Sequence, residues 1–369
     1  MRYRAVTSSF IHFVVFTGTS GKTLARSATA YAYKKAGLHV VSPPYGYTNE
    51  LGIVLAALGI ESVHLFSLQG IRKVLSASLQ QETYVCIELG ADFRSDIPWF
   101  LKRFTPQGVC ITNVSDKVWT KDLSSLWKDK KDLIACIPTG GFLCYSAHNT
   151  SIDRIRHIEA STQDIQVALF QTNIVSDSSF NYSSSNTKYI FTSPLAILMP
   201  YTEAFGFAIA SLEILNKNFV FPEIFFSEYI PVQERISKRV TTHGATLVTD
   251  TYKAIPESME YVLGFALTIS SKKKIAVVSA MHPLWAHTHE HYGTLISFLN
   301  RFDKVYCIGP QKVSSLLAKK VHGLQIIHDT SHYQEIAMQI QKELQPETVL
   351  VIHGASRYHL EKLVTLVTK

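Results

Sequence analysis

A short run of small and polar residues near the start of the chain has the composition of a phosphate-binding loop. The run Gly18-Thr19-Ser20-Gly21-Lys22-Thr23 follows the apolar stretch FVVFT and precedes the helix-forming stretch LARSATAYAYKKAG. Glycines let the backbone turn tightly, and a helix that starts directly after them points N–H groups at a bound anion. In such a loop Lys22 reaches phosphate oxygens and the Thr23 hydroxyl binds Mg²⁺. The alternative is a chance glycine-rich turn between a strand and a helix.

The loop departs from the general GxxxxGKT pattern, because Phe16 stands where that pattern has its first glycine. The stretch TGTSGKT resembles instead the loop of the Mur ligase family, which also lacks this glycine. Other segments resemble the same family in the same order, from about residue 10 to residue 368, with details most similar to the branch that adds D-alanyl-D-alanine. These segments are Tyr47–Ile53 (NNEIGVP in the family), Ile87–Ala91 (EMGA), Pro106–Val114 (P-x-x-x-x-I-T-N-I), Lys130–Leu133 (K-x-E-I), Glu234-Arg235 (GR), Thr249–Met259 (DDSYNANPDSM), His289–Gly293 (H-x-x-x-G) and Val349–Arg357 (VLVKGSR).

The resemblance implies an ATP-dependent acid–amino-acid ligase. In this family a substrate carboxylate attacks the γ phosphate of ATP, and an amine displaces phosphate from the resulting acyl phosphate. The expected partners are therefore a small-molecule carboxylate, an amino acid or dipeptide, ATP and Mg²⁺, in peptidoglycan precursor synthesis. Cations and amide donors have to neutralise the anionic oxygens of such a reaction.

The resemblance also assigns roles to individual residues. Its catalytic set is Lys22, Glu88, Lys130 and Arg235, with Thr23 as a ligand of a first Mg²⁺ and Glu88 as a ligand of a second. Lys130 matches a lysine that the family carbamylates. Gly18, Thr19, Ser20, Gly21, Lys22 and Thr23 would hold the ATP phosphates, and Arg235, Asp250 and Tyr252 would contact ATP from the second domain.

Each assignment has an ordinary alternative. Glu88 could be an ordinary exposed residue at the end of a strand. Lys130 lies in the run KDKKD, which is typical of a solvated helix surface. Arg235 and Asp250 could form a surface ion pair of little consequence.

Some family positions carry other residues. Val118 stands where a metal-associated histidine is expected, Phe207 stands at the adenine-binding asparagine, and Lys253 and Ile255 replace two further asparagines. The loop starts at residue 17, which leaves no room for the uridine-binding domain of cell-wall ligases, so the expectation is either that a separate chain supplies uridine-nucleotide binding or that the acceptor differs. The alternatives are a folylpolyglutamate-synthase-like ligase, a catalytically weakened ATP-binding protein with a regulatory or scaffold role, and a simple P-loop ATPase.

The elements that would position these residues alternate between apolar, β-branched runs and amphipathic stretches. This pattern predicts an α/β fold: a P-loop-containing central domain (residues 1–221) with a mostly parallel sheet, and a smaller Rossmann-like C-terminal domain (residues 222–369). Between VALFQT and KYIFTS, the polar stretch SDSSFNYSSSNTK predicts a long hairpin loop. The predicted strands are 10–17, 63–66, 84–88, 108–113 and 142–146 in the first domain, and 245–250, 274–280, 304–309, LQIIHD and 348–354 in the second.

Composition narrows the setting. The net charge of +7 comes from scattered lysines and arginines rather than one basic block, so a nucleotide or acidic substrate, or simply a solvated basic surface, is expected rather than nucleic acid. Five widely spaced cysteines without a CxxC pair indicate buried thiols in a reducing cytoplasm. The apolar run at the start is too short to span a bilayer and lacks a cleavage site, so neither secretion nor membrane insertion is expected.

A histidine cluster in MHPLWAHTHEHYG lies outside the family pattern. Only His287 and His291 would share a helix face, because i and i+2 residues point apart. The alternatives are a zinc site and a polar loop that leads into a helix, with His289 near the substrate.

Overall fold

The structure is a computed structural model that describes residues 11–43, 50–58, 82–90, 96–114, 123–149, 151–159, 164–281 and 288–368. Its contacts divide the chain into two compact units, Met1–Ile230 and Pro231–Lys369, which are treated separately below. The predicted strand at 63–66, the segment 44–49, Val118 and the histidines 282 and 287 lie outside the described residues. None of the described helices has the length and apolar character that crossing a bilayer requires.

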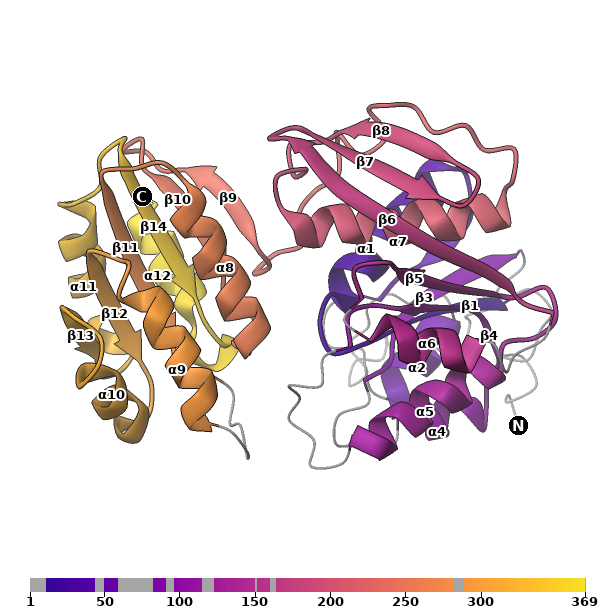
Figure 1. The fold of residues 1–369 in the computed structure, drawn as a ribbon, viewed down its shortest axis with the longest axis horizontal. Helices are drawn as coiled ribbons and strands as arrows, with labels where there is room; N and C mark the ends of the chain where they lie inside the picture. The colour runs from indigo at the N-terminus through magenta and orange to yellow at the C-terminus, as the bar shows by residue number, and fades with distance from the viewer. Residues whose placement is uncertain are drawn as a thin grey trace, which may run out of the picture. The chain divides into compact units, whose positions relative to one another are not determined.

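The first unit is built on an eight-stranded sheet in the order β2-β3-β1-β4-β5-β6-β7-β8 (Figure 1). The neighbours from β2 to β6 pair in parallel, and β6, β7 and β8 pair antiparallel. The apolar runs are buried on both faces, as parallel strands between helices require. The strands are β1 (Ile11–Thr17), β2 (Val40–Val41), β3 (Thr83–Glu88), β4 (Pro106–Ile111), β5 (Phe142–Ser146), β6 (Gln166–Ser176), β7 (Ser179–Ser184) and β8 (Lys188–Thr192).

Helices cover both faces of this sheet. On one face α1 (Lys22–Lys35) packs against α7 (Met199–Leu215), whose run AFGFAIAS is apolar all round and is buried. On the other face the apolar core joins the central strands to α2 (Glu50–Ala57), α4 (Asp96–Leu101), α5 (Leu123–Ala135) and α6 (Ile152–Glu159) (Figure 1). Side chains of one strand alternate between these two faces, which decides which helix each candidate residue meets.

The prediction of a long loop in the serine-rich stretch is wrong in part, because this stretch contains strand β7. Phe180 and Tyr182 alternate with polar residues and are fully buried against neighbours such as Phe170 and Phe191. Asn181 between them is exposed. Two aromatic side chains at a spacing of two residues are enough to hold a strand whose other face is polar.

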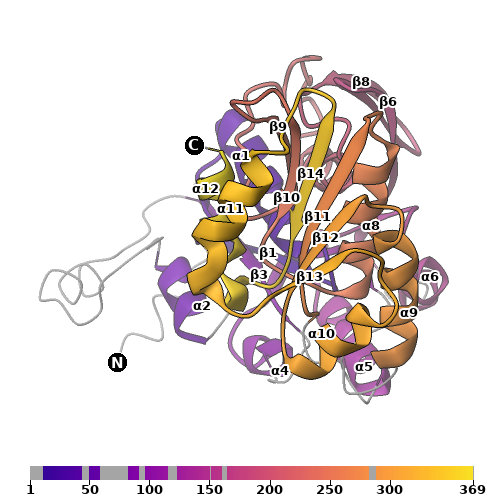
Figure 2. The ribbon, with the colours of Figure 1, turned by 90° about the vertical axis from the view of Figure 1, so that its left-hand side faces the viewer.

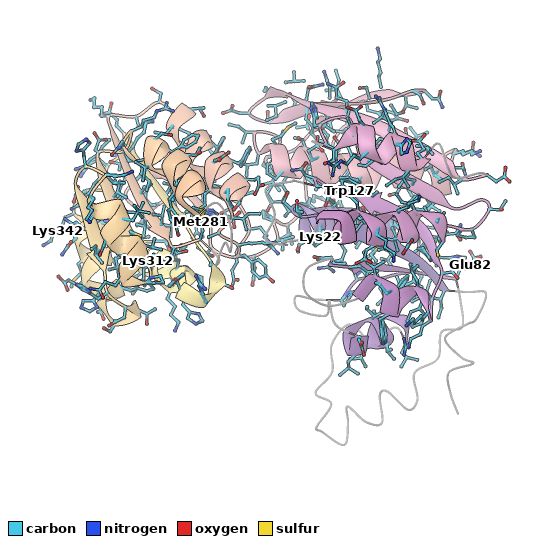
Figure 3. The ribbon with its side chains drawn as sticks, turned by 60° about the horizontal axis from the view of Figure 1, so that its bottom comes forward. Lys22, Glu82, Trp127, Met281, Lys312 and Lys342 are labelled. Carbon is cyan, nitrogen blue, oxygen red and sulfur yellow. The ribbon has the colours of Figure 1, made fainter. Side chains whose placement is uncertain are left out.

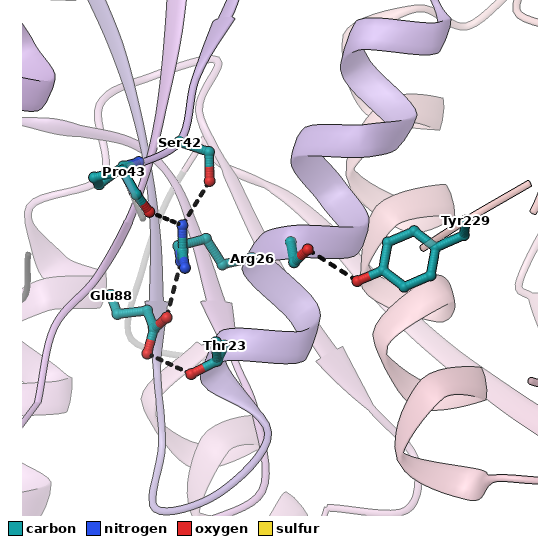
Figure 4. A network of polar contacts seen from close by, with 7 residues as sticks. Thr23, Arg26, Ser42, Pro43, Glu88 and Tyr229 are labelled. Carbon is teal, nitrogen blue, oxygen red and sulfur yellow. Dashed lines mark hydrogen bonds and ion pairs between the residues drawn. The ribbon is translucent and has the colours of Figure 1, made fainter. Parts of the chain in front are cut away.

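The end of the first unit extends past residue 221, where the sequence analysis placed the boundary. Phe226 stacks on Phe205 of α7, and the Tyr229 hydroxyl donates a hydrogen bond of 2.9 Å to Ser27 Oγ of α1 (Figure 4). The segment of residues 222–230 is therefore part of the first unit, and the division falls between Ile230 and Pro231.

The second unit is a six-stranded sheet in the order β13-β12-β11-β14-β10-β9, in which β9 alone pairs antiparallel. Figure 2 shows α11 and α12 beside one face of this sheet and α8 and α9 beside the other. The predicted fold class, two α/β units with mostly parallel sheets, is confirmed. The strands are β9 (Ser237–Val240), β10 (Thr246–Asp250), β11 (Lys273–Ser279), β12 (Lys304–Ile308), β13 (Leu324–Ile327) and β14 (Thr348–His353), and the helices are α8 (Pro256–Thr268), α9 (Thr288–Leu299), α10 (Gln311–Ala318), α11 (Tyr333–Gln341) and α12 (Leu360–Val367).

Candidate functional site

The loop between β1 and α1 adopts a backbone conformation that requires its glycines. Gly18 has φ +147° and Gly21 has φ +84°. A Cβ atom at Gly18 would lie 2.1 Å from Thr112 Oγ1, so position 18 excludes every side chain. Gly21 is the N-cap of α1, and the first N–H groups of a helix have no acceptor within that helix. The first turn of α1 therefore presents the positive end of a helix to an anion.

Neighbouring strand ends hold the loop in this shape. Thr19 donates from both its N–H (2.9 Å) and its hydroxyl (3.0 Å) to the carbonyl oxygen of Asn113, and the N–H of Ser20 lies 3.4 Å from the same oxygen. The buried Asn149, which follows β5, donates to the carbonyl oxygen of Thr112 at 2.8 Å. The loop is thereby fixed to the ends of β4 and β5. Because the N–H groups of Thr19 and Ser20 shape the loop, the first turn of α1 is its anion-facing part.

Lys22 and Thr23 begin α1 at this loop. The Lys22 ammonium donates to the carbonyl oxygen of Gly18 at 2.6 Å and so lies across the loop. Figure 3 labels the position of Lys22 in the first unit. The Thr23 hydroxyl donates to Glu88 Oε2 at 3.1 Å (Figure 4). The structure thus brings together three residues that the sequence analysis assigned to phosphate and metal binding: the loop lysine, the loop threonine and the glutamate that ends β3.

Arg26, one turn further along α1, is the second partner of Glu88. Its Nε lies 2.8 Å from Glu88 Oε1, and both side chains are nearly buried, with 9% and 11% of their surface exposed. Glu88 is therefore not the exposed strand terminus that the sequence left as an alternative. A buried carboxylate needs such a partner because an isolated charge is costly to remove from water.

The oxygen atoms at Thr23 and Glu88 fit a divalent metal bound together with a nucleotide. Hydroxyl and carboxylate oxygens are the hard ligands that Mg²⁺ prefers, and nucleotide sites use one or two carboxylates and leave the remaining positions to phosphate oxygens and water. Within the described part of the chain, no three His, Cys, Asp or Glu side chains are grouped as metal ligands.

Lys130 of α5 reaches the base of the loop from the opposite face of the sheet. Its side chain is fully buried, and Nζ lies 3.5 Å from Thr17 Oγ1, in the residue that ends β1. The run KDKKD therefore does not lie wholly on the solvated helix surface, although the next lysine, Lys131, is exposed. Burying an ammonium group is costly unless it is paired or hydrogen-bonded.

In the second unit, three predicted nucleotide residues form one cluster at the end of β10. The Arg235 guanidinium lies over the Tyr252 ring at 3.7 Å from its centroid. Burial raises the pKa of Asp250 to about 7, although the nearby charge of Arg235 and the N–H of Tyr252 act to lower it. The buried Oδ1 of Asp250 has no hydrogen-bond partner among the described residues. A charged guanidinium, an aromatic face and an acceptor oxygen are groups that can recognise a nucleotide.

Glu234 precedes this arginine in a backbone conformation that favours glycine, with φ +58°. The Mur ligase resemblance places a glycine at this position. The chain thus keeps the left-handed turn that directs Arg235 toward Tyr252 while carrying a side chain that this turn disfavours.

His353 ends β14, next to Asp250 at the end of the neighbouring strand β10, and the sequence analysis did not single it out. Its Nδ1 donates to the carbonyl oxygen of Asp250 at 2.7 Å, because a carbonyl only accepts. Its Nε2 lies 3.3 Å from Ser258 Oγ. The side chain is fully buried, and this burial lowers the pKa of His353 to about 4. The neutral ring fastens β14 to the residue that ends β10.

Two of the departures from the family pattern are core residues. Phe207 is 2% exposed and packs edge-on against Phe170, and Ile255, just before α8, is also 2% exposed. Neither side chain offers a polar group in place of the asparagine that it replaces. Lys253 is half-buried.

Comparison with known proteins adds to this picture. Residues 234–356 match the family model described as Mur ligase, glutamate ligase domain. The matched residues lie in the second unit and include the cluster of Arg235, Asp250 and Tyr252. No curated protein matches the chain.

Solved structures of ligases share the fold over nearly the whole chain. MurF ligase from Thermotoga maritima in complex with ADP has a TM-score of 0.75 and 18% identity, over 99% of this chain and 82% of that one. MurF from Acinetobacter baumannii has a TM-score of 0.76 and 16% identity, over 100% and 78%. A folylpolyglutamate synthase/dihydrofolate synthase from Yersinia pestis, complexed with AMPPNP and Mn ion, has a TM-score of 0.68 and 14% identity, over 99% and 91%. Both units of this chain thus share their fold with parts of these ligase structures.

Proposed function

We propose that this protein is an ATP-dependent ligase that joins a carboxylate to an amine through an acyl phosphate. The observation that carries the proposal is the Thr23 hydroxyl 3.1 Å from the Glu88 carboxylate, at the helix terminus that follows Gly18 and Gly21. Further support comes from the match of residues 234–356 to a Mur ligase domain and from the shared fold.

The residues of the loop supply phosphate binding in this proposal. The first turn of α1 and the Lys22 ammonium neutralise oxygens of the β and γ phosphates, which lowers the free energy of a transition state with charge spread over those oxygens. Lys22 already lies over the loop, so it reaches an incoming phosphate by releasing the carbonyl oxygen of Gly18. Gly18, Thr19 and Ser20 would shape the loop around the phosphates.

Thr23 and Glu88 would hold Mg²⁺, which supplies positive charge against the phosphate oxygens when it is bound. Lys130 would act from the other face, and the proposed carbamylation, in which its deprotonated amine adds CO₂ and loses a proton, would replace the buried ammonium by a carbamate anion able to support a metal. Catalysis by Arg235, and nucleotide contacts by Arg235, Asp250 and Tyr252, are proposed for the second unit.

For the substrate we propose a peptidoglycan precursor and an amino acid or dipeptide, following the sequence resemblance to the D-alanyl-D-alanine-adding branch. A separate chain would provide uridine-nucleotide binding, and the reaction would take place in the cytoplasm. The second candidate is a folylpolyglutamate-synthase-like ligase. It is favoured by the Yersinia pestis relative, of which this chain covers 91%, against 78% and 82% for the two MurF structures.

A protein that binds ATP without ligase turnover is the alternative from a different class. It is motivated by Phe207 and Ile255, which are core residues where adenine-binding asparagines were expected. It predicts tight nucleotide binding and no phosphate release with any mixture of carboxylates and amines.

The test is phosphate release from ATP with candidate carboxylates and amines, given singly and in pairs. Release that requires both co-substrates supports the ligase. Lys22→Ala should reduce this rate by on the order of 10²–10³-fold, as expected when one preorganised donor to a developing charge is lost. Lys34→Ala, an exposed lysine on the same helix, is the matched control and should leave the rate unchanged. A paired rate that Lys22→Ala leaves intact contradicts the proposal.

A further inference from the structure

Arg26 makes more polar contacts than its role as a counter-charge to Glu88 requires. The side chain is almost wholly buried, with the residue 7% exposed. Besides the 2.8 Å contact from Nε to Glu88 Oε1, its Nη1 donates to Ser42 Oγ at 2.6 Å and to the carbonyl oxygen of Pro43 at 2.5 Å (Figure 4). One guanidinium thus connects α1, the end of β3 and the segment directly after β2.

The planar guanidinium makes this connection directional. Nε and Nη1 have fixed directions relative to each other, so the contacts at Ser42 and Pro43 determine where Nε points. Nε in turn determines where Glu88 Oε1 lies. The other oxygen, Oε2, is left beside the Thr23 hydroxyl, at 3.1 Å. A lysine has a single nitrogen on a flexible stem and would not impose the same geometry.

We propose that Arg26 is a positioning residue of the divalent metal site. It holds one oxygen of Glu88 so that the other is presented to the metal beside Thr23. The inference rests on the proposed function, which assigns the metal to Thr23 and Glu88. Groups that hydrogen-bond to metal-binding carboxylates orient them, and their loss typically weakens metal affinity by about 10–100-fold.

Charge and geometry predict opposite effects when Arg26 is neutralised. Removing a positive charge next to Glu88 would by itself strengthen the attraction between that carboxylate and a cation. Removing the hydrogen bonds frees the carboxylate to rotate, and ordering it again costs side-chain entropy when the metal binds. If positioning dominates, metal affinity falls in Arg26→Gln. If Arg26 only screens charge, metal affinity rises.

The experiment is a Mn²⁺ titration of the full chain in the presence of ADP, with free Mn²⁺ followed by electron paramagnetic resonance. ADP affinity in EDTA and thermal unfolding are measured for each variant. Arg26→Gln should weaken Mn²⁺ binding by about 10-fold or more while ADP affinity in EDTA stays unchanged. Arg26→Lys should fall between Arg26→Gln and the wild type. Ser42→Ala removes one contact of Nη1 but leaves Pro43 and Glu88 in place, and should bind Mn²⁺ nearly as the wild type does.

Equal or tighter Mn²⁺ binding by Arg26→Gln overturns the inference. If Arg26→Gln does not fold, Arg26→Lys decides, because Mn²⁺ binding equal to the wild type in that variant shows that charge alone is sufficient. The proposed metal site itself is overturned if the wild type binds ADP equally well in Mn²⁺ and in EDTA and if Glu88→Gln does not change this ADP affinity. If instead the wild type binds Mn²⁺ and Arg26→Gln binds it equally well, the metal site stands and only the positioning role of Arg26 is rejected.

Discussion

Glu88 and Asp250 end parallel strands at comparable places in the two units, yet their surroundings differ. Glu88 accepts hydrogen bonds from Arg26 and Thr23 through its two oxygens. Asp250 has a buried Oδ1 without a hydrogen-bond partner among the described residues, and burial raises its pKa to about 7. The same position in an α/β unit therefore gives a charge-paired carboxylate in one case and a carboxylate that changes charge near neutral pH in the other. The difference comes from the side chains that neighbouring elements bring to the strand end.

The largest expected difference is between Glu88→Gln and Asp250→Asn. Glu88→Gln leaves the buried Arg26 without its anion, which should lower the free energy of unfolding by about 3 kcal/mol. Asp250→Asn removes a carboxylate that is already destabilised by burial, so it should cost little or stabilise the protein at pH 8. Urea unfolding of both variants at pH 8 measures this. Equal losses in the two variants would remove the contrast between the two strand ends.

A second comparison is between the buried Lys130 and the exposed Lys131, which are neighbours in the sequence. Lys130→Met keeps the volume of the side chain, and exchange of a buried charge for an apolar group is often neutral for stability. On the proposed ligase chemistry it should nevertheless lower the co-substrate-dependent rate by on the order of 100-fold, since the loop loses a charge at its base. Lys131→Met, at the next and exposed position, should change neither property. Normal turnover in Lys130→Met would make this lysine a purely structural residue.

Asp250 should make the second unit less stable as pH rises. Its pKa in the folded state is raised to about 7, above the value of about 3.9 for an unfolded chain, so the folded state binds the proton more tightly. The stabilisation is complete below pH ~4 and is lost as pH rises to about 7, in total on the order of a few kcal/mol. The free energy of unfolding of the wild type minus that of Asp250→Asn should fall over this window and then stay constant. A difference that is independent of pH would contradict the raised pKa.

His353 provides the opposite control on the neighbouring strand. Burial lowers its pKa to about 4 from an ordinary value of 6.5, so the neutral ring stabilises the folded state above pH 6.5. That contribution is lost as pH falls from 6.5 toward 4. In His353→Gln the loss of stability across this acidic window should be smaller than in the wild type, as followed by urea unfolding.

The smallest expected effect is at Glu234, beside Arg235. Glu234→Gly relieves the cost of a side chain at φ +58° but makes the unfolded chain more flexible, so the net gain should be a few tenths to about 1 kcal/mol. Gly37→Ala, at φ +83° with no atom within 4 Å of the added Cβ, tests the reverse change at an open site and should lose about 1 kcal/mol. A destabilised Glu234→Gly would mean that the glutamate side chain makes a contact worth more than the strain.

Several features were predictable because they depend on residues close together in sequence. The apolar runs that became β1, β10 and β14 were correctly predicted as strands, and the Gly18–Thr23 run was correctly placed between a strand and a helix. Arg26 was missed, although it lies three residues after Thr23 and therefore on the same helix face. His353 was missed because a histidine at the end of TVLVIH carries no local sign of its acceptor, the carbonyl oxygen of Asp250.

The sequence by itself determined the local conformations: where glycine permits the loop, where apolar alternation makes strands, and in what order helices follow them. Only the tertiary structure decided which charges are buried. Lys130 and Lys131 are adjacent and chemically identical, yet one is enclosed by the first unit and the other is exposed. Burial and pairing depend on side chains brought together across many residues of chain, as with Arg26 and Glu88, and local propensity contains no information about such distant neighbours.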